Sequence, residues 1–179
     1  IAEYRTVISL SPNSKIAQNA QYWIGQIFFE TKQFDDALST FQELVDEFPS
    51  SVVVPTTKTM IERAQQAKKN RTLFEAVRKA DVEKVKLLIS EGADVDAKWR
   101  DVYSRDEEDP WTQDPERTAL RHAVKAGNIE VIKLLVEAGA DVNAGEWTPL
   151  FQAVDENNTA IAEYLIDHGA NVNIEWGQG

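Results

Sequence analysis

Three related stretches recur in the second half of the chain: GADVDA at residues 92–97, GADVNA at 139–144 and GANVNI at 169–174. Each follows a mostly apolar run (VKLLI, IKLLV or AEYLI), and each run follows a shorter motif (LFEA, TALRHA or TPLFQA). An apolar segment at helical spacing that is closed by a glycine is typical of a helix ending in a left-handed turn. The recurrence of the whole unit predicts a stack of helical hairpins, because such units bury their apolar faces against their neighbours.

These motifs resemble the ankyrin repeat, whose helix opens on T-P-L-H-x-A and whose exit reads G-A-D-V-N-A. Three copies cover residues 71 to 174 approximately. The resemblance implies an inner helix, an outer helix and a short β-hairpin finger in each copy, and a concave face that binds other proteins. Thr118 and Thr148 stand where the inner helix would be capped. The signature histidine is replaced in all three copies, by Phe74, Arg121 and Phe151.

The spacing of the copies indicates one insertion and one shortened hairpin. Ala76 and Ala123 are 47 residues apart, and Ala123 and Ala153 are 30 residues apart. The usual ankyrin period is about 33 residues, so about 14 residues are inserted in the first finger, roughly over 99–116. The second finger is trimmed near Gly145. Insertions in such arrays fall on loops, which often carry the binding function.

The first 70 residues carry a different internal repeat, with a shift of 37 residues. It aligns Tyr4 with Phe41, Val7 with Leu44, Ile8 with Val45 and Pro12 with Pro49. Between these segments, Ser14 is expected to cap a helix with an apolar stripe. A second helix is expected from about Phe34 to Phe48. The spacing therefore predicts an antiparallel helical hairpin in this part of the chain.

Residues 18–51 resemble the tetratricopeptide repeat, whose signature is W-x2-L-G-x2-Y…A-x3-F…P. The signature positions fall on Gln21, Ile24, Gly25, Phe28, Ala37, Phe41 and Pro49. Gly25 and Ala37 are small where the two helices would approach closely. The stretch NAQYWIG at residues 19–25 is similar to the repeats of the periplasmic tetratricopeptide protein of the Tol–Pal system. A helix over residues 57–69 is expected to close this array.

Together the resemblances imply an all-α helical repeat solenoid. Tetratricopeptide hairpins would occupy residues 1–70, and ankyrin repeats with short β-hairpin fingers would occupy residues 71–179. The charge changes at the same place, from 7 basic and 8 acidic side chains in the first segment to 12 and 22 in the second. Because the sequence opens and closes inside repeats, we expect it to be a window of a longer solenoid with apolar faces exposed at both ends.

Composition argues against several functional classes. The chain has no cysteine, which excludes disulfides, thiolate nucleophiles and Cys-ligated metals. A net charge of −11 argues against nucleic-acid binding, and no apolar run approaches the ~18 residues that would span a membrane. With two histidines and no phosphate-binding or catalytic motif, we expect no enzyme activity, no cofactor and no small-molecule substrate.

An acidic run at residues 106–109 suggests calcium, but it lacks the ligand spacing of an EF-hand. We therefore expect no metal site, and a solvated acidic loop is the favoured interpretation. A small-molecule or metal site in the insert is the alternative. It predicts that calcium would stabilise the protein.

Tryptophan placement suggests a binding surface. Trp99 and Trp111 belong to the insert, and Trp147 directly precedes an inner helix. Exposed Trp and Arg side chains are typical of interface hot spots, although packing among the fingers is an alternative role for these tryptophans. If the ankyrin geometry carries over, its concave face exposes Arg117, Arg121, Lys125, Trp147, Asp155 and Glu156. In the tetratricopeptide segment a second stripe is formed by Tyr22, Gln26 and Phe29, of which Phe29 suits the core equally well.

We therefore predict a protein–protein interaction scaffold that uses the concave ankyrin face and fingers, with the tetratricopeptide groove as a second surface. The acidic ankyrin segment favours a basic or mixed-charge protein partner. The alternative is a non-catalytic positioning segment of a larger enzyme or cell-envelope assembly protein. The compartment stays open between bacterial periplasm and cytoplasm.

Overall fold

The chain forms two compact units, Ile1–Lys68 and Lys69–Gly179. They are seen in a computed structural model that describes residues 1–98, 100 and 117–173. Within these ranges the structure is helical, with turns and bends between the helices. None of the described helices is long and apolar enough to cross a membrane.

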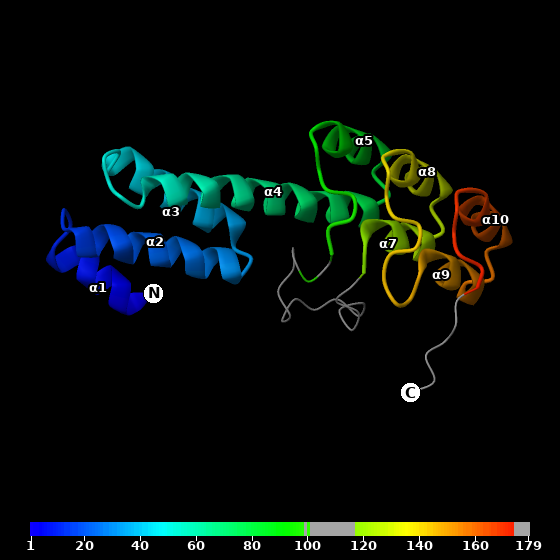
Figure 1. Cartoon of the computed structure of the whole chain (residues 1–179), viewed down its shortest axis with the longest axis horizontal. Coiled ribbons are helices and arrows are strands. Elements are labelled where there is room, and N and C mark those ends of the chain that lie inside the picture. Colours follow the sequence, from blue (N-terminus) through cyan, green and yellow to red (C-terminus); the bar gives the residue numbers. More distant parts are fainter. Residues whose placement is uncertain (99, 101–116, 174–179) are drawn as a thin grey trace. The chain divides into compact units, whose positions relative to one another are not determined.

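The first unit begins with three helices, α1 (Ala2–Leu10), α2 (Lys15–Glu30) and α3 (Phe34–Glu47). Helix α2 packs against both α1 and α3 (Figure 1). The Ser14 hydroxyl accepts a hydrogen bond from the Ala17 N–H at 3.0 Å, which confirms the predicted cap. A Cβ on Gly25 would lie 2.4 Å from Cε1 of Phe41, so glycine is what allows α2 and α3 to approach. The close approach predicted at Gly25 is thereby confirmed.

Helix α4 runs without a break from Val54 to Arg78, and the division between the two units falls inside it. Residues 57–69 are helical, as expected, but the expectation that this helix is separate from the inner helix of the first ankyrin repeat is wrong. Residues 58–72 contain no Gly or Pro and are rich in Lys, Arg, Gln and Ala, which favour helix. Arg71 also occupies the position at which Thr118 and Thr148 cap later helices, so the side chain that would start a new helix is missing.

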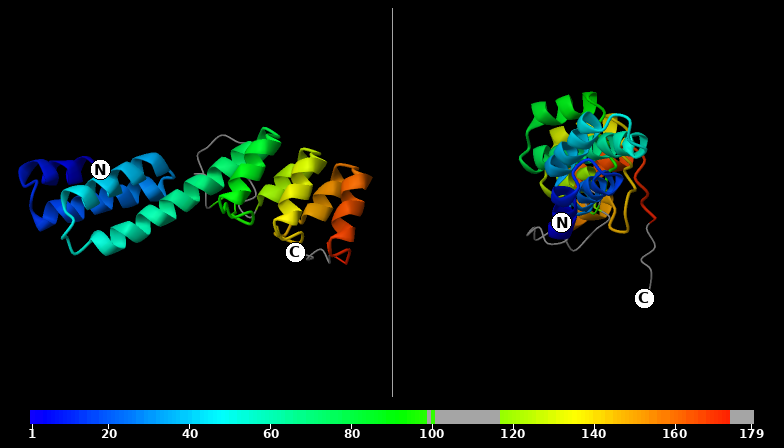
Figure 2. Two further views of the ribbon diagram at one scale, coloured as in Figure 1. Left: turned by 90° about the horizontal axis from the view of Figure 1, so that it is seen from above. Right: turned by 90° about the vertical axis from the view of Figure 1, so that its left-hand side faces the viewer.

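The second unit consists of three successive repeats, each with an inner and an outer helix. Repeat 1 combines the end of α4 with α5 (Val82–Ser90). Repeat 2 combines α7 (Ala119–Lys125) with α8 (Ile129–Glu137), and repeat 3 combines α9 (Pro149–Asp155) with α10 (Thr159–Asp167). Inner helix α7 packs on α9 and outer helix α5 packs on α8, so the repeats stack side by side (Figures 1 and 2).

The same local structure recurs in each repeat. Thr118 and Thr148 accept hydrogen bonds from the N–H groups of Arg121 and Phe151, which confirms the predicted caps of the inner helices. Each outer helix is capped by an Asp or Asn side chain, from Asp81, Asn128 and Asn158. The glycines that end the outer helices have φ of 79°, 91° and 92°, as predicted for Gly92, Gly139 and Gly169.

A second left-handed position, between the inner and outer helix, was not predicted. It is occupied by Ala80, Gly127 and Asn157, with φ of 53°, 67° and 53°. Only Gly127 carries the residue type that favours this conformation most, so the residue types at these three positions do not predict it.

One core runs through the three repeats, and its largest side chains include Leu73, Phe74, Leu120, Ile132 and Leu135. A smaller core in the first unit contains Ala37, Phe41 and Met60. The inner helices therefore present one face to the core, and their ends and the segments before them carry the candidate site.

The expected β-hairpin strands are absent from the described finger residues, which form turns and bends. Side chains provide the acceptors that strand pairing would otherwise supply. Asp96 Oδ1 accepts from the N–H of Asp141 at 2.9 Å, and Asn143 Oδ1 accepts from the N–H of Asn171 at 2.8 Å. Successive fingers are thus joined by Asp and Asn side chains. Most of the predicted insert, together with its Trp99 and Trp111, lies outside the described residues.

Candidate functional site

The candidate site lies on α7 and α9, which occupy equivalent places in repeats 2 and 3. Thr118 and Thr148 cap the two helices at equivalent positions of the repeat. Lys125 and Asp155 are therefore equivalent residues in the last turns of α7 and α9. We use the name inner-helix surface for the residues at the end of α7 and at both ends of α9, namely His122, Lys125, Ala126, Trp147, Asp155 and Glu156.

A shallow depression of about 290 Å³ opens on this surface. It is lined by His122, Lys125, Ala126 and Glu156, so α7 and the residue after α9 contribute to it together. Glu156 is held in place because Gln152 Nε2 donates a hydrogen bond to its Oε1 at 3.0 Å. A cationic and an anionic group therefore face the same hollow.

Electrostatics around Lys125 are mixed. Burial lowers the pKa of its ammonium group, and the nearby cations Arg117 and Arg121 act in the same direction. The carboxylates of Glu156 and Asp155 oppose them and raise this pKa. The surface thus has a basic side on repeat 2 and an acidic side on repeat 3.

Arg117 and Arg121 were expected to be exposed, and this expectation is wrong. They are buried, with 5% and 7% of their surface accessible. Burial also lowers the pKa of Arg121. Their residue types matched the exposed face of an ankyrin repeat, but burial depends on what surrounds each position and cannot be read from the type. Although both side chains are buried, their positive charges act on Lys125 at the inner-helix surface.

Trp147 is 46% exposed and stands directly before α9. Its ring meets that of Phe151 edge to face, with centroids 4.9 Å apart. The two rings hold each other in position, which lowers the entropy that Trp147 would lose on contact with another molecule. Asp155 and Glu156, at the other end of α9, are both exposed.

In the first unit, Tyr22, Gln26 and Phe29 are half-buried and engaged within the unit. Gln26 Nε2 donates to the Tyr22 hydroxyl at 2.8 Å. The Phe29 ring packs at 5.8 Å from that of Phe34, and the Arg63 guanidinium lies 5.5 Å from the Phe29 centroid. Phe29 thus packs against the small core, which was the alternative role considered for it.

Sequence reasoning missed two features of these surfaces. His122 was not placed in the site, yet it lines the depression with Lys125. The signal in the sequence was its place on the inner helix, three residues before Lys125. Trp23 is exposed in the first unit, where its ring meets Tyr22 edge to face at 5.7 Å.

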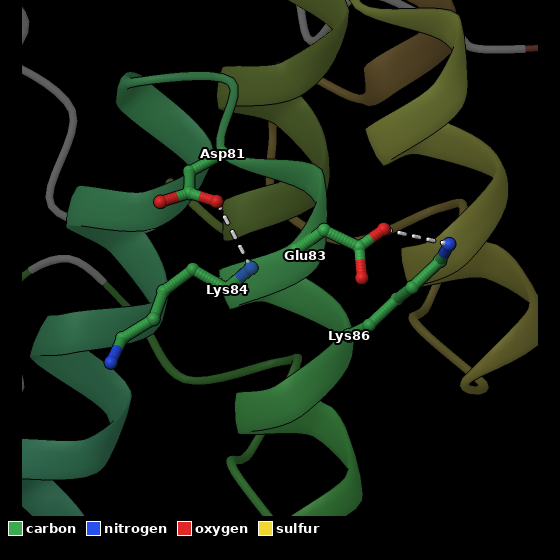
Figure 3. A network of polar contacts seen from close by, with 4 residues as sticks. All are labelled: Asp81, Glu83, Lys84 and Lys86. Carbon is green, nitrogen blue, oxygen red and sulfur yellow. Dashed lines mark hydrogen bonds and ion pairs between the residues drawn. The ribbon is translucent and has the colours of Figure 1, made fainter.

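The outer face of repeat 1 has a different character (Figure 3). Asp81 caps α5 by accepting from the Lys84 N–H at 3.0 Å, and Glu83 pairs with Lys86 at 3.3 Å. The exposed ion pair of Glu83 and Lys86 contributes little to stability. This face carries charge on the outer helix of another repeat and is a suitable reference surface for experiments. Across the described residues no group of three or more His, Asp or Glu side chains is placed to hold a metal.

The family model described as "Ankyrin repeats (3 copies)" matches residues 73–175. The chain belongs to the ankyrin repeat family. A model described as "Tetratricopeptide repeat" matches residues 19–51, which confirms the tetratricopeptide-then-ankyrin order. The similarity to the Tol–Pal protein stays a prediction. A comparison with curated proteins gives no match. Both kinds of repeat are generally modules for protein–protein interaction.

Proposed function

We propose that the chain is a non-catalytic scaffold that binds a protein partner on the inner-helix surface. The observation that carries the proposal is Trp147, a large, exposed aromatic side chain that precedes α9 and is steadied by Phe151 on that helix. Rigidly held aromatics contribute much of the affinity in protein interfaces.

The partner we propose carries both signs of charge. An acidic group would meet Lys125, and a basic group would meet Asp155 and Glu156. The ankyrin segment as a whole is acidic, with 12 basic and 22 acidic side chains from residue 71 onward. Its long-range field would favour the basic side of the partner during encounter.

The groove of the first unit is proposed as a second docking surface through Tyr22, Gln26 and Phe29. The hydrogen bond and ring contacts of these side chains lie within the unit, so the side chains would already be held in place when a partner binds. We expect this surface to contribute less than the inner-helix surface.

The experiment is affinity capture from the source cells with quantitative mass spectrometry, followed by titration of the captured partner. We expect Trp147→Ala to weaken binding tenfold or more, equal to about 1.4 kcal/mol. Lys125→Glu is also expected to weaken it. Leu87→Ala and Lys86→Glu, on the outer helix of repeat 1, are the controls, because they truncate an equally exposed apolar side chain and reverse the same charge elsewhere. The proposal fails if Trp147→Ala and Lys125→Glu stay folded and bind as tightly as the controls.

A further inference from the structure

A ladder of hydrogen bonds runs through the segments that follow α5, α8 and α10, here fingers 1 to 3. In each finger an Asp or Asn donates its backbone N–H to an earlier side chain and accepts, at its own side chain, the N–H two residues later. In finger 1, Asp94 Oδ1 accepts from Asp96 at 3.0 Å, and Asp96 Oδ1 accepts from Asp141 of finger 2 at 2.9 Å. The pattern continues through Asn143 to Asn171 of finger 3, at 2.8 Å for both bonds. Backbone and side-chain groups thus alternate along the whole ladder.

The ladder begins on helix α4, at Asn70. Its Oδ1 accepts from the N–H of Asp94 at 2.9 Å, which is the same kind of contact that joins finger 1 to finger 2 and finger 2 to finger 3. Only 8% of the surface of Asn70 is accessible, so its side chain is held in place. The neighbouring Lys69 donates from Nζ to the carbonyl of Glu91 at 2.6 Å. Two successive residues of α4 therefore hold finger 1, as each finger of the stack holds the next.

The ladder leads to the segment that carries Trp147. Asn143 is bonded to finger 3 through both its Oδ1 and its Nδ2. The N–H of Ala144 donates to the carbonyl of Asp141 at 3.2 Å, which closes finger 2. Trp147 follows three residues after Ala144 and directly precedes Thr148, the capping residue of α9. The ladder therefore sets where this short segment begins, and the helix cap sets where it ends.

We propose that Asn70 is a positioning residue for the inner-helix surface, because it anchors the ladder to α4 and so positions the segment that carries Trp147. This inference rests on the proposed function. Each residue of the ladder takes part in two of its bonds, and hydrogen bonds in such chains strengthen one another. Loss of the acceptor at Asn70 therefore weakens the bond at Asp94 directly and the link from finger 1 to finger 2 in turn.

The test compares Asn70→Ala with Gln65→Ala in the full chain. Gln65 is an exposed amide on the same helix, so its truncation is the matched control. Hydrogen exchange followed by NMR measures the protection of single amides. An ordinary hydrogen bond corresponds to roughly a fivefold change in an equilibrium, so we expect Asn70→Ala to accelerate exchange at Asp94 about fivefold. We expect exchange at Asp141 to accelerate about twofold and the indole N–H resonance of Trp147 to shift, and Gln65→Ala to change neither.

Asn70→Asp is the rescue variant. It keeps an acceptor on α4, as Asp96 provides a carboxylate acceptor between fingers 1 and 2. We expect this variant to recover much of the protection at Asp141 and to return the Trp147 resonance toward its original position. The amide of Leu135, in the core of α8, reports global unfolding and should accelerate less than that of Asp141.

Three results would overturn the inference. One is faster exchange at Asp94 alone, with Asp141 and Trp147 unchanged. Another is equal acceleration at Asp141 and Leu135, because the effect would then be global. The third is an Asn70→Asp variant that behaves like Asn70→Ala.

None of these readouts needs a partner, so they are separate from the test of the proposed function. With the captured partner, we expect Asn70→Ala to weaken binding about threefold, since Trp147 would be less well positioned. Loosened fingers with unchanged binding would contradict the positioning role. Unchanged binding by Trp147→Ala would instead reject the proposed function itself.

Discussion

At the scale of single residues, Asp96 marks a difference between otherwise equivalent fingers. Asp96 and Asn143 occupy equivalent positions in successive repeats, and each accepts a hydrogen bond from a backbone N–H of the next finger. Burial raises the pKa of the Asp96 carboxyl, and repulsion from Asp141 and Asp94 adds to this effect. The N–H of Asp141 partly offsets it. The folded state therefore holds a proton on Asp96 more tightly than the unfolded state does.

Because the pKa of Asp96 is raised in the folded state, its ionisation costs stability, and this gives a prediction for Asp96→Asn. Ionisation of Asp96 lowers the stability of the folded state as pH rises above the unfolded pKa of about 4. The amide keeps the acceptor and adds a donor, which in Asn143 reaches the Gly169 carbonyl at 3.1 Å. We expect the variant to be more stable than the wild type by about 0.5–1 kcal/mol at pH 7.

Urea unfolding at pH 7 and pH 4 measures this difference. The advantage of the variant should shrink at pH 4, where Asp96 in the wild type takes up its proton. Asn143→Asp is the reverse control and should destabilise the protein at pH 7. Equal stabilities of Asp96→Asn and wild type at pH 7 would contradict this account of the finger contacts.

At the scale of elements, the contact between α2 and α3 depends on Gly25. We expect Gly25→Ala to destabilise the protein by about 1–3 kcal/mol, because the new methyl group would overlap the Phe41 ring. Thermal or urea unfolding measures the change. Adding Phe41→Leu should recover part of the loss, so that the two substitutions are not additive. Full additivity would show that the loss at Gly25 does not come from overlap with the Phe41 ring.

The elements also show what the sequence could and could not predict. The positions of α7 to α10 were predictable from the Thr caps and from the glycines that end the outer helices, because these signals are local and recur along the sequence. The continuity of α4 was missed, although the absence of a capping residue at Arg71 was visible. The lack of strands in the described fingers was also missed, because it depends on side chains of one repeat bonding to the backbone of the next.

At the scale of the molecule, the two repeat families and their order were predictable from motif spacing. The site was only partly predictable. Trp147, Asp155 and Glu156 are exposed as expected, whereas Arg117 and Arg121 are buried. Exposure of a repeat position depends on its neighbours in three dimensions, which residue type alone does not encode. The pairing of His122 with Glu156 in one depression likewise required the fold.

The central claim is that the inner-helix surface contacts the partner, and site-specific photo-crosslinking tests it most directly. A photoreactive phenylalanine analogue would replace Trp147 in one protein, and Leu87 or Lys86 in two references. All three positions are exposed, so the probe is accessible in each. We predict a crosslinked partner from position 147 and none from positions 87 and 86. Crosslinks from position 87 or 86 but not from 147, in folded proteins, would contradict the claim.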